Sequence, residues 1–179
     1  MSMLIFIFLI LGIVILVLQT TFLQLLPSWL GKPDILFLLV VYVAFKADIL
    51  RGAFIILLLG LLMDTFSGVY LGFYPAIYLL VFAFIKGISR RIVIDEYAYQ
   101  VPLAVISYLF VCTGMFIFSF NLAPDSSLPW SWGTILLQLL ILAVTGVPVF
   151  GIFDTIMNFY NSSSASGRFL GTKRSNRFK

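Results

Sequence analysis

The positive charges of this chain lie in short segments between long apolar ones, and this pattern limits the possible folds most strongly. Of the eleven Lys and Arg residues, ten form three clusters, each following an even-numbered apolar stretch. The clusters are Lys46/Arg51, Lys86/Arg90/Arg91 and the tail residues Arg168, Lys173, Arg174, Arg177 and Lys179. Because cytoplasmic loops of membrane proteins collect Lys and Arg, the clusters mark one side of a membrane, with only Lys32 on the other. The pattern predicts an integral membrane protein with both termini in the cytoplasm.

The composition agrees with a membrane protein and argues against a nucleic-acid-binding one. Charged residues make up 10% of the 179 residues, whereas a soluble domain has about 25%. The pI is about 9.3, but the basic residues flank apolar stretches instead of lining a polar face. We therefore expect the basic loops and tail to meet anionic lipid, and we expect no nucleic-acid partner.

Six apolar stretches predict an all-α membrane domain over residues 1–160. A spanning helix needs roughly 20 apolar residues, and we expect one helix in each stretch. The predicted transmembrane helices cover residues 3–25, 34–47, 49–66, 72–88, 97–120 and 131–160. Trp29, Trp130 and Trp132 fall at predicted outer boundaries, where amphipathic rings are favoured.

Two of these helices depart from a simple span. The second has an apolar core of residues 35–45 only, or about 17 Å of helix. It either extends through Lys46, with the ammonium group reaching the interface, or forms a re-entrant segment. The last is long for one span, and we expect Gly146, Pro148 and Gly151 to kink it.

The tail, residues 161–179, is rich in Ser and Gly and carries five basic and no acidic residues. This composition predicts a disordered cytoplasmic segment. It could bind lipid or the cytoskeleton, or it could act only as a topology anchor.

The chain offers little for catalysis or metal binding. It has no histidine and a single cysteine, Cys112, so the commonest general base and metal ligand is missing. No P-loop, nucleophile elbow or metal-binding spacing occurs. We expect no enzymatic activity, no metal and no cofactor. Scattered polar residues inside the spans, such as Gln19 and Gln100, are interpreted as packing contacts.

Asp64 is the strongest candidate for a functional side chain. It lies 12 residues after Gly52, about 18 Å along the third helix, where an ionisable group normally faces protein or water. It could bind a solute or a partner, or it could accept backbone N–H groups at the turn to the fourth helix. Gly60, Gly68 and Gly72 surround it, allow close helix packing, and include a GxxxG spacing.

Two further acidic residues lie near predicted spans. Asp34 follows Pro33 directly before an apolar run, which favours a helix N-cap over a functional role. The second and third helices are neighbours, so Asp34 and Asp64 lie toward the same leaflet and could share a polar pocket. Asp154, near the end of the last helix, could form a structural salt bridge with Arg90 or Arg91.

Two segments resemble the rod-shape-determining MreD family. Residues 33–44 begin with Pro-Asp and place Tyr42 and Ala44 in an apolar run, as at the start of that family's second helix. Residues 60–72 are similar to a family segment that matches here at Gly60, Asp64, Ser67, Gly68, Leu71 and Gly72. The specific likeness covers about residues 33–78, and the remainder matches in hydropathy and in Pro148. The tail is longer and richer in Ser than the family pattern.

The resemblance implies a bacterial inner-membrane scaffold of the cell-elongation machinery. Such a protein binds the single-span protein MreC, and through it connects to MreB, RodA and a penicillin-binding protein. Its fold would be similar to the six-helix substrate-binding subunit of energy-coupling-factor vitamin transporters. The site residues would be Pro33, Asp34, Gly60, Asp64, Gly68 and Gly72, acting in helix packing, partner binding or a polar pocket. The alternative function is that of such a transporter subunit, and a membrane transferase is disfavoured by the missing histidine.

Overall fold

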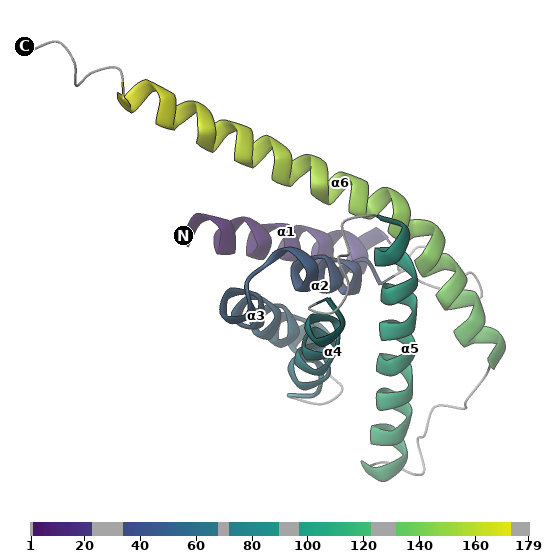
Figure 1. The fold of residues 1–179 in the computed structure, drawn as a ribbon. Helices are drawn as coiled ribbons and strands as arrows, with labels where there is room; N and C mark the ends of the chain where they lie inside the picture. Colours follow the sequence, from purple (N-terminus) through teal and green to yellow (C-terminus); the bar gives the residue numbers. More distant parts are fainter. Residues whose placement is uncertain (1, 23–33, 68–71, 90–96, 123–131, 173–179) are drawn as a thin grey trace, which may run out of the picture.

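The protein is all-helical in the residues that the computed structural model describes: 2–22, 34–67, 72–89, 97–122 and 132–172. These ranges contain six α-helices and no strand. They are α1 (Ser2–Phe22), α2 (Ile35–Lys46), α3 (Ile49–Ser67), α4 (Phe73–Ser89), α5 (Tyr97–Leu122) and α6 (Trp132–Thr172). Figure 1 shows α1 to α4 grouped together, α5 beside α4, and α6 arching across the bundle. Each helix begins within one residue of its predicted start.

Helix α2 forms the centre of the bundle. Every residue from Leu36 to Ala44 is fully buried, and α2 contacts each of the other five helices. A helix that is apolar on all sides is normally buried, either in a protein core or in lipid. With 12 residues, α2 is about 18 Å long. Its shortness is tolerated because protein covers the side chains from Leu36 to Ala44, so α2 does not have to match the bilayer thickness by itself.

Glycines bring α3 and α4 into close contact. A Cβ atom at Gly60 would lie 2.6 Å from the Cα of Pro75, and one at Gly52 would lie 2.8 Å from Cε2 of Phe82. Both distances are too short for a real side chain, so only glycine fits without a shift of the neighbour. Small residues at helix contacts of this kind are typical of membrane bundles.

Large apolar side chains cover the outside of the bundle. Leu50, Phe6 and Val144 have 86%, 67% and 66% of their surface exposed, and many others are similarly open. In the described part of the chain, three helical segments are long and apolar enough to cross a membrane: Ile49–Ser67, Tyr99–Phe118 and Trp132–Phe159. Soluble monomers rarely expose apolar surface on this scale, so the exterior is that of a membrane protein.

Helix α6 continues further than predicted. It extends to Thr172, beyond residue 160, where the last span was predicted to end. Extending an existing helix costs far less free energy than starting a new one. No proline follows Pro148 in the sequence to end α6. Residues 173–179 lie outside the described part of the chain. Figure 1 shows α6 bending partway along its length, which fits Pro148 inside the helix.

Candidate functional site

Polar side chains gather at both ends of the apolar helix α2. The carboxylate end comprises Gln19, Asp34, Asp64, Tyr74 and Tyr78, around the N-terminus of α2. The ion-pair end comprises Tyr42, Lys46, Asp48, Arg51 and Asp154, around its C-terminus. Two of the sequence-predicted site residues, Pro33 and Gly68, lie outside the described residues.

Asp34 is the N-cap of α2. Its Oδ1 accepts a hydrogen bond from the backbone N–H of Phe37 at 3.0 Å. The first N–H groups of a helix have no partner within the helix, and an aspartate at this position supplies one. The N-cap predicted from Pro33-Asp34 before an apolar run is therefore present.

Gln19 completes this cap from a different helix. Its Nε2 lies 3.4 Å from Asp34 Oδ1, and its Oε1 accepts from the backbone N–H of Leu36 at 3.3 Å. One side chain of α1 thus holds both the capping carboxylate and a second orphan N–H of α2. The interpretation of Gln19 as a packing contact missed this role, because its partners lie 15 and 17 residues away along the chain.

Asp64 performs the equivalent task for α4. Although only 4% of its surface is exposed, both carboxylate oxygens have donors. Oδ1 accepts from the backbone N–H of Tyr74 at 3.0 Å, and Oδ2 accepts from that of Gly72. Of the two interpretations of Asp64, the structure thus displays the backbone contacts of the capping one. These hydrogen bonds offset the free-energy cost of burying the Asp64 carboxylate away from water.

The glycines near Asp64 have different roles. Gly60 provides the close approach of α3 to α4, as the packing interpretation expects. Gly72 does not: no atom of the described residues lies within 4 Å of the position of a Cβ there. Its φ of 91° is the reason for glycine, because side chains rarely adopt this conformation. Gly72 directly precedes α4, which begins at Phe73, whereas Gly68 lies outside the described residues, so their GxxxG spacing stays a prediction.

Two tyrosines of α4, Tyr74 and Tyr78, lie near both carboxylates. Tyr74 and Tyr78 both interact electrostatically with Asp34 and Asp64, which places the four groups in one polar region. Ser67 Oγ lies 3.4 Å from the Tyr74 hydroxyl. The Tyr78 hydroxyl is fully buried and has no hydrogen-bond partner among the described residues. A buried hydroxyl of this kind can bind an ordered water or a polar ligand group.

At the other end, Asp154 of α6 binds α2 through two side chains. The Tyr42 hydroxyl donates to Asp154 Oδ1 at 2.6 Å, and Lys46 Nζ lies 3.3 Å from the same oxygen. Tyr42 and Lys46 are four residues apart, so they lie on one face of α2. The expected partners, Arg90 and Arg91, lie outside the described residues. Among the described residues, Asp154 forms a salt bridge with Lys46.

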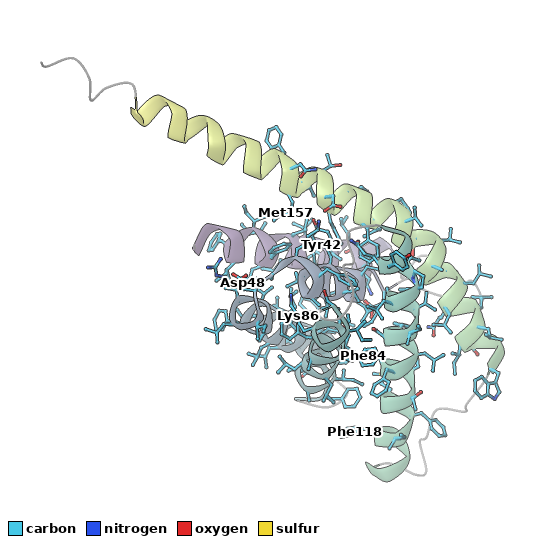
Figure 2. All side chains as sticks on the ribbon, in the orientation of Figure 1. Tyr42, Asp48, Phe84, Lys86, Phe118 and Met157 are labelled. Carbon is cyan, nitrogen blue, oxygen red and sulfur yellow. The ribbon has the colours of Figure 1, made fainter. Side chains whose placement is uncertain are left out.

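Aromatic rings enclose this contact. Tyr42 packs against Phe8 of α1 and Phe153 of α6, with ring centroids 6.3 Å and 5.3 Å apart. Lys46 is not buried with the rings, as 46% of its side chain is exposed, whereas Asp154 is 14% exposed. Met157 of α6, labelled in Figure 2, lines a small cavity together with Phe8, Lys46 and Asp48. The charged head of Lys46 therefore reaches solvent or interface while its partner stays largely inside.

The two ends offer binding and structural chemistry. The carboxylates accept backbone N–H groups, and the ion pair joins two helices. Within the described residues, no group of three acidic, His or Cys side chains could hold a metal ion. Comparison of the chain with family models, with characterised proteins and with solved structures finds no match.

Proposed function

We propose that this protein is a membrane scaffold of the bacterial elongation machinery, of the MreD type. It would cross the cytoplasmic membrane six times, with both termini inside, and bind a single-span MreC protein. Through that partner it would help couple MreB to RodA and a penicillin-binding protein. The proposal begins from the resemblance of residues 33–44 and 60–72, and the geometry of these segments supports it.

The observation that carries the proposal is the position of the two motif carboxylates. Asp34 caps the fully buried α2, and Asp64 caps α4, so each motif fixes the start of a helix in the same region. Motif residues that fix helix starts also determine how the helices are arranged. The helix arrangement then determines the outer surface that a partner protein contacts. That is the property expected of an assembly protein.

The distribution of charge supports the proposed topology. The described cations Lys46, Arg51 and Lys86 lie at the end of the bundle opposite Asp34. By the positive-inside rule this end faces the cytoplasm, which puts Asp34 and Asp64 toward the outer leaflet. The apolar exterior gives these helices a surface suited to lipid.

Cell shape provides the first test. Cells depleted of their own copy would receive either the wild-type chain or the Asp64→Ala variant, at matched protein levels in the membrane. We expect the variant to lose rod shape and to recover less of the single-span partner, because α4 loses its N-terminal acceptor. Asp48→Ala is the matched control, since the Asp48 side chain is 70% exposed. Normal rods and normal partner recovery with Asp64→Ala would reject the role assigned to Asp64.

The second candidate function is a substrate-binding subunit of an energy-coupling-factor vitamin transporter. The Tyr78 hydroxyl favours it, because this buried group near two carboxylates has no hydrogen-bond partner among the described residues and could bind a polar ligand. This candidate predicts that a small molecule stays bound through purification at a ratio near one per chain. It also predicts that Tyr78→Phe abolishes that retention.

A further inference from the structure

A cluster of three phenol groups lies near the capping carboxylate of Asp34. Tyr78 of α4 and Tyr108 of α5 both interact electrostatically with this carboxylate. The ring of Phe37, three residues after Asp34, has its centroid 6.3 Å from that of Tyr78 and 5.2 Å from that of Tyr108. The third phenol, Tyr74, packs against Tyr78 with ring centroids 5.8 Å apart. Side chains from three helices therefore meet at the N-terminus of α2.

The hydroxyl of Tyr78 has no protein partner within this cluster. It is fully buried, and none of the described residues forms a hydrogen bond with it. Among the electrostatic influences on this hydroxyl, that of Asp34 is the largest, followed by those of Tyr74, Tyr108 and Asp64. Buried hydroxyls are nearly always bonded to protein, water or an ion, because leaving one unbonded costs free energy. The Tyr78 oxygen is therefore available as a ligand.

Asp34 also has acceptor capacity left. The hydrogen bonds from Phe37 and Gln19 both end on its Oδ1, and no described residue donates to Oδ2. Asp64, in contrast, uses both of its carboxylate oxygens for backbone N–H groups. The cluster thus offers one carboxylate oxygen, from Asp34, together with the hydroxyl oxygens of neighbouring phenols.

The negative charge of the cluster is not matched by a cation among the described residues. Neither Asp34 nor Asp64 takes part in an ion pair there, whereas Lys46 and Arg51 pair with other aspartates at the ion-pair end. Buried charges in proteins are normally paired or bind metal ions, and ionisable groups inside membrane proteins often mark ion sites. A water molecule could bond to the Tyr78 hydroxyl, but it would not balance the charge. A cation could do both.

The available oxygens favour a monovalent ion. Hard cations bind oxygen ligands, and Ca²⁺ takes six to eight of them, with several carboxylates in its tight sites. Within the described residues, no group of three acidic side chains could supply such a site. One free carboxylate oxygen beside neutral hydroxyls instead balances a single positive charge. An ion of this size also needs little more space than an ordered water molecule.

We propose that the carboxylate end binds one monovalent alkali cation, such as Na⁺, between Oδ2 of Asp34 and the hydroxyl of Tyr78. The bound ion would tie the start of α2 to α4, in addition to the cap that Asp34 forms. The inference goes beyond the scaffold function and does not depend on it, because the ion binds within the bundle whatever partner the protein meets.

Equilibrium dialysis of the purified full chain in detergent against radioactive Na⁺ tests the site. Choline chloride keeps the ionic strength constant while the Na⁺ concentration is varied. We expect saturable binding near one ion per chain. We also expect the melting temperature to rise when Na⁺ replaces choline, because an ion that binds only the folded state stabilises it. The melting measurement uses the wild type and needs no variant.

Two substitutions and a matched control assign the binding to named atoms. Asp34→Asn keeps a helix N-cap but removes the charge, so it should abolish saturable binding. Tyr78→Phe removes one neutral ligand and should weaken the affinity about tenfold, the equivalent of one hydrogen bond. Tyr42→Phe removes a buried phenol hydroxyl at the ion-pair end and should leave the affinity unchanged. Helix content and elution volume show whether each variant is folded.

Several results would overturn the site. The wild type could show neither saturable binding nor a change in melting temperature, or Asp34→Asn or Tyr78→Phe could bind Na⁺ as tightly as the wild type. Choline could displace Na⁺ as well as K⁺ does, which would indicate diffuse attraction. Binding that occurs only after Lys32→Gln would mean that the chain supplies its own cation. Recovery of the MreC-type partner is measured separately, so failure of the ion site and failure of the scaffold function are distinguishable.

Discussion

At both ends of α2, aspartate side chains are held by partner groups, but the partner groups differ in kind. At the carboxylate end, Asp34 and Asp64 accept hydrogen bonds from backbone N–H groups, which carry no net charge. At the ion-pair end, Asp154 meets a lysine and a tyrosine hydroxyl from α2. The first arrangement fixes where helices begin, whereas the second ties one helix to another. The difference shows which contacts of a membrane bundle are local and which depend on its assembled fold.

The distances along the chain make this difference concrete. Asp34 caps a residue three positions later, and Asp64 binds Tyr74 ten positions later. Tyr42 and Asp154 are 112 positions apart. We therefore expect the carboxylate end to form early and locally, and the ion-pair end to require that α6 has docked.

The largest expected effect is at the carboxylate end. Asp64→Ala removes the acceptor for two backbone N–H groups in a buried site, and each orphaned donor costs about 1–3 kcal/mol. We expect the free energy of unfolding in mixed micelles to fall by about 2–5 kcal/mol. Asp48→Ala, at an exposed aspartate, should change it by less than about 0.5 kcal/mol. Equal effects of the two variants would contradict the capping role of Asp64.

The close approach of α3 and α4 gives the next largest effect. Gly60→Ala would place a Cβ 2.6 Å from the Cα of Pro75, so one backbone must move. Overpacking of this kind costs about 1–3 kcal/mol. Gly151→Ala in α6 is the control, because among the described residues no atom beyond the adjoining helix backbone lies within 4 Å of its Cβ position, and alanine favours the helix. If Gly60→Ala is as stable as Gly151→Ala, the helices do not approach as described.

Neutralising Asp154 at the ion-pair end should lower the free energy of unfolding by a smaller amount. Asp154→Asn removes the charge that binds Lys46, but Lys46 is half-exposed and can reach water. We expect a loss of about 1–2 kcal/mol, below the roughly 3–5 kcal/mol of a fully buried pair. A double-mutant cycle with Tyr42→Phe should give a coupling energy of about 1 kcal/mol. A coupling energy of zero would mean that the 2.6 Å contact does not stabilise the fold.

The smallest effect is at the cap of α2. Asp34→Ala should cost about 1 kcal/mol, and Asp34→Asn should cost much less because asparagine also caps helices. Thermal unfolding in detergent can separate the two variants. If Asp34→Asn destabilises the fold as much as Asp34→Ala, the negative charge of Asp34 contributes more to stability than its acceptor oxygen, which would contradict the capping role.

The contacts that sequence could predict are the local ones. Asp34 lies directly before an apolar run, and this pattern is a known start signal for a helix, so its cap was predictable. The helix starts were equally predictable, because long apolar runs bounded by polar residues limit where each helix can begin. For Asp64, the sequence did not distinguish capping from ligand binding. The backbone N–H groups that bind Asp64 follow a turn, and no sequence motif predicts the shape of this turn.

The remaining contacts depend on tertiary arrangement. Nothing near Gln19 indicates that it would reach α2, and Tyr42 within an apolar run resembles any buried aromatic residue. Lys46 and Asp154 lie far apart along the chain, and only the packing of α6 against α2 brings them together. The composition of the tail gives no sign that α6 continues through residues 161–172, because extending an existing helix depends on the helix before it.

The most direct test of the scaffold proposal is recovery of partners. The tagged full chain would be purified from its native membrane in mild detergent, and bound proteins and small molecules identified by mass spectrometry. We predict a single-span MreC-type protein together with cell-wall synthases. Recovery of ATPase subunits with a large membrane coupling protein, or of one vitamin molecule per chain, would contradict the proposal and support the transporter function instead.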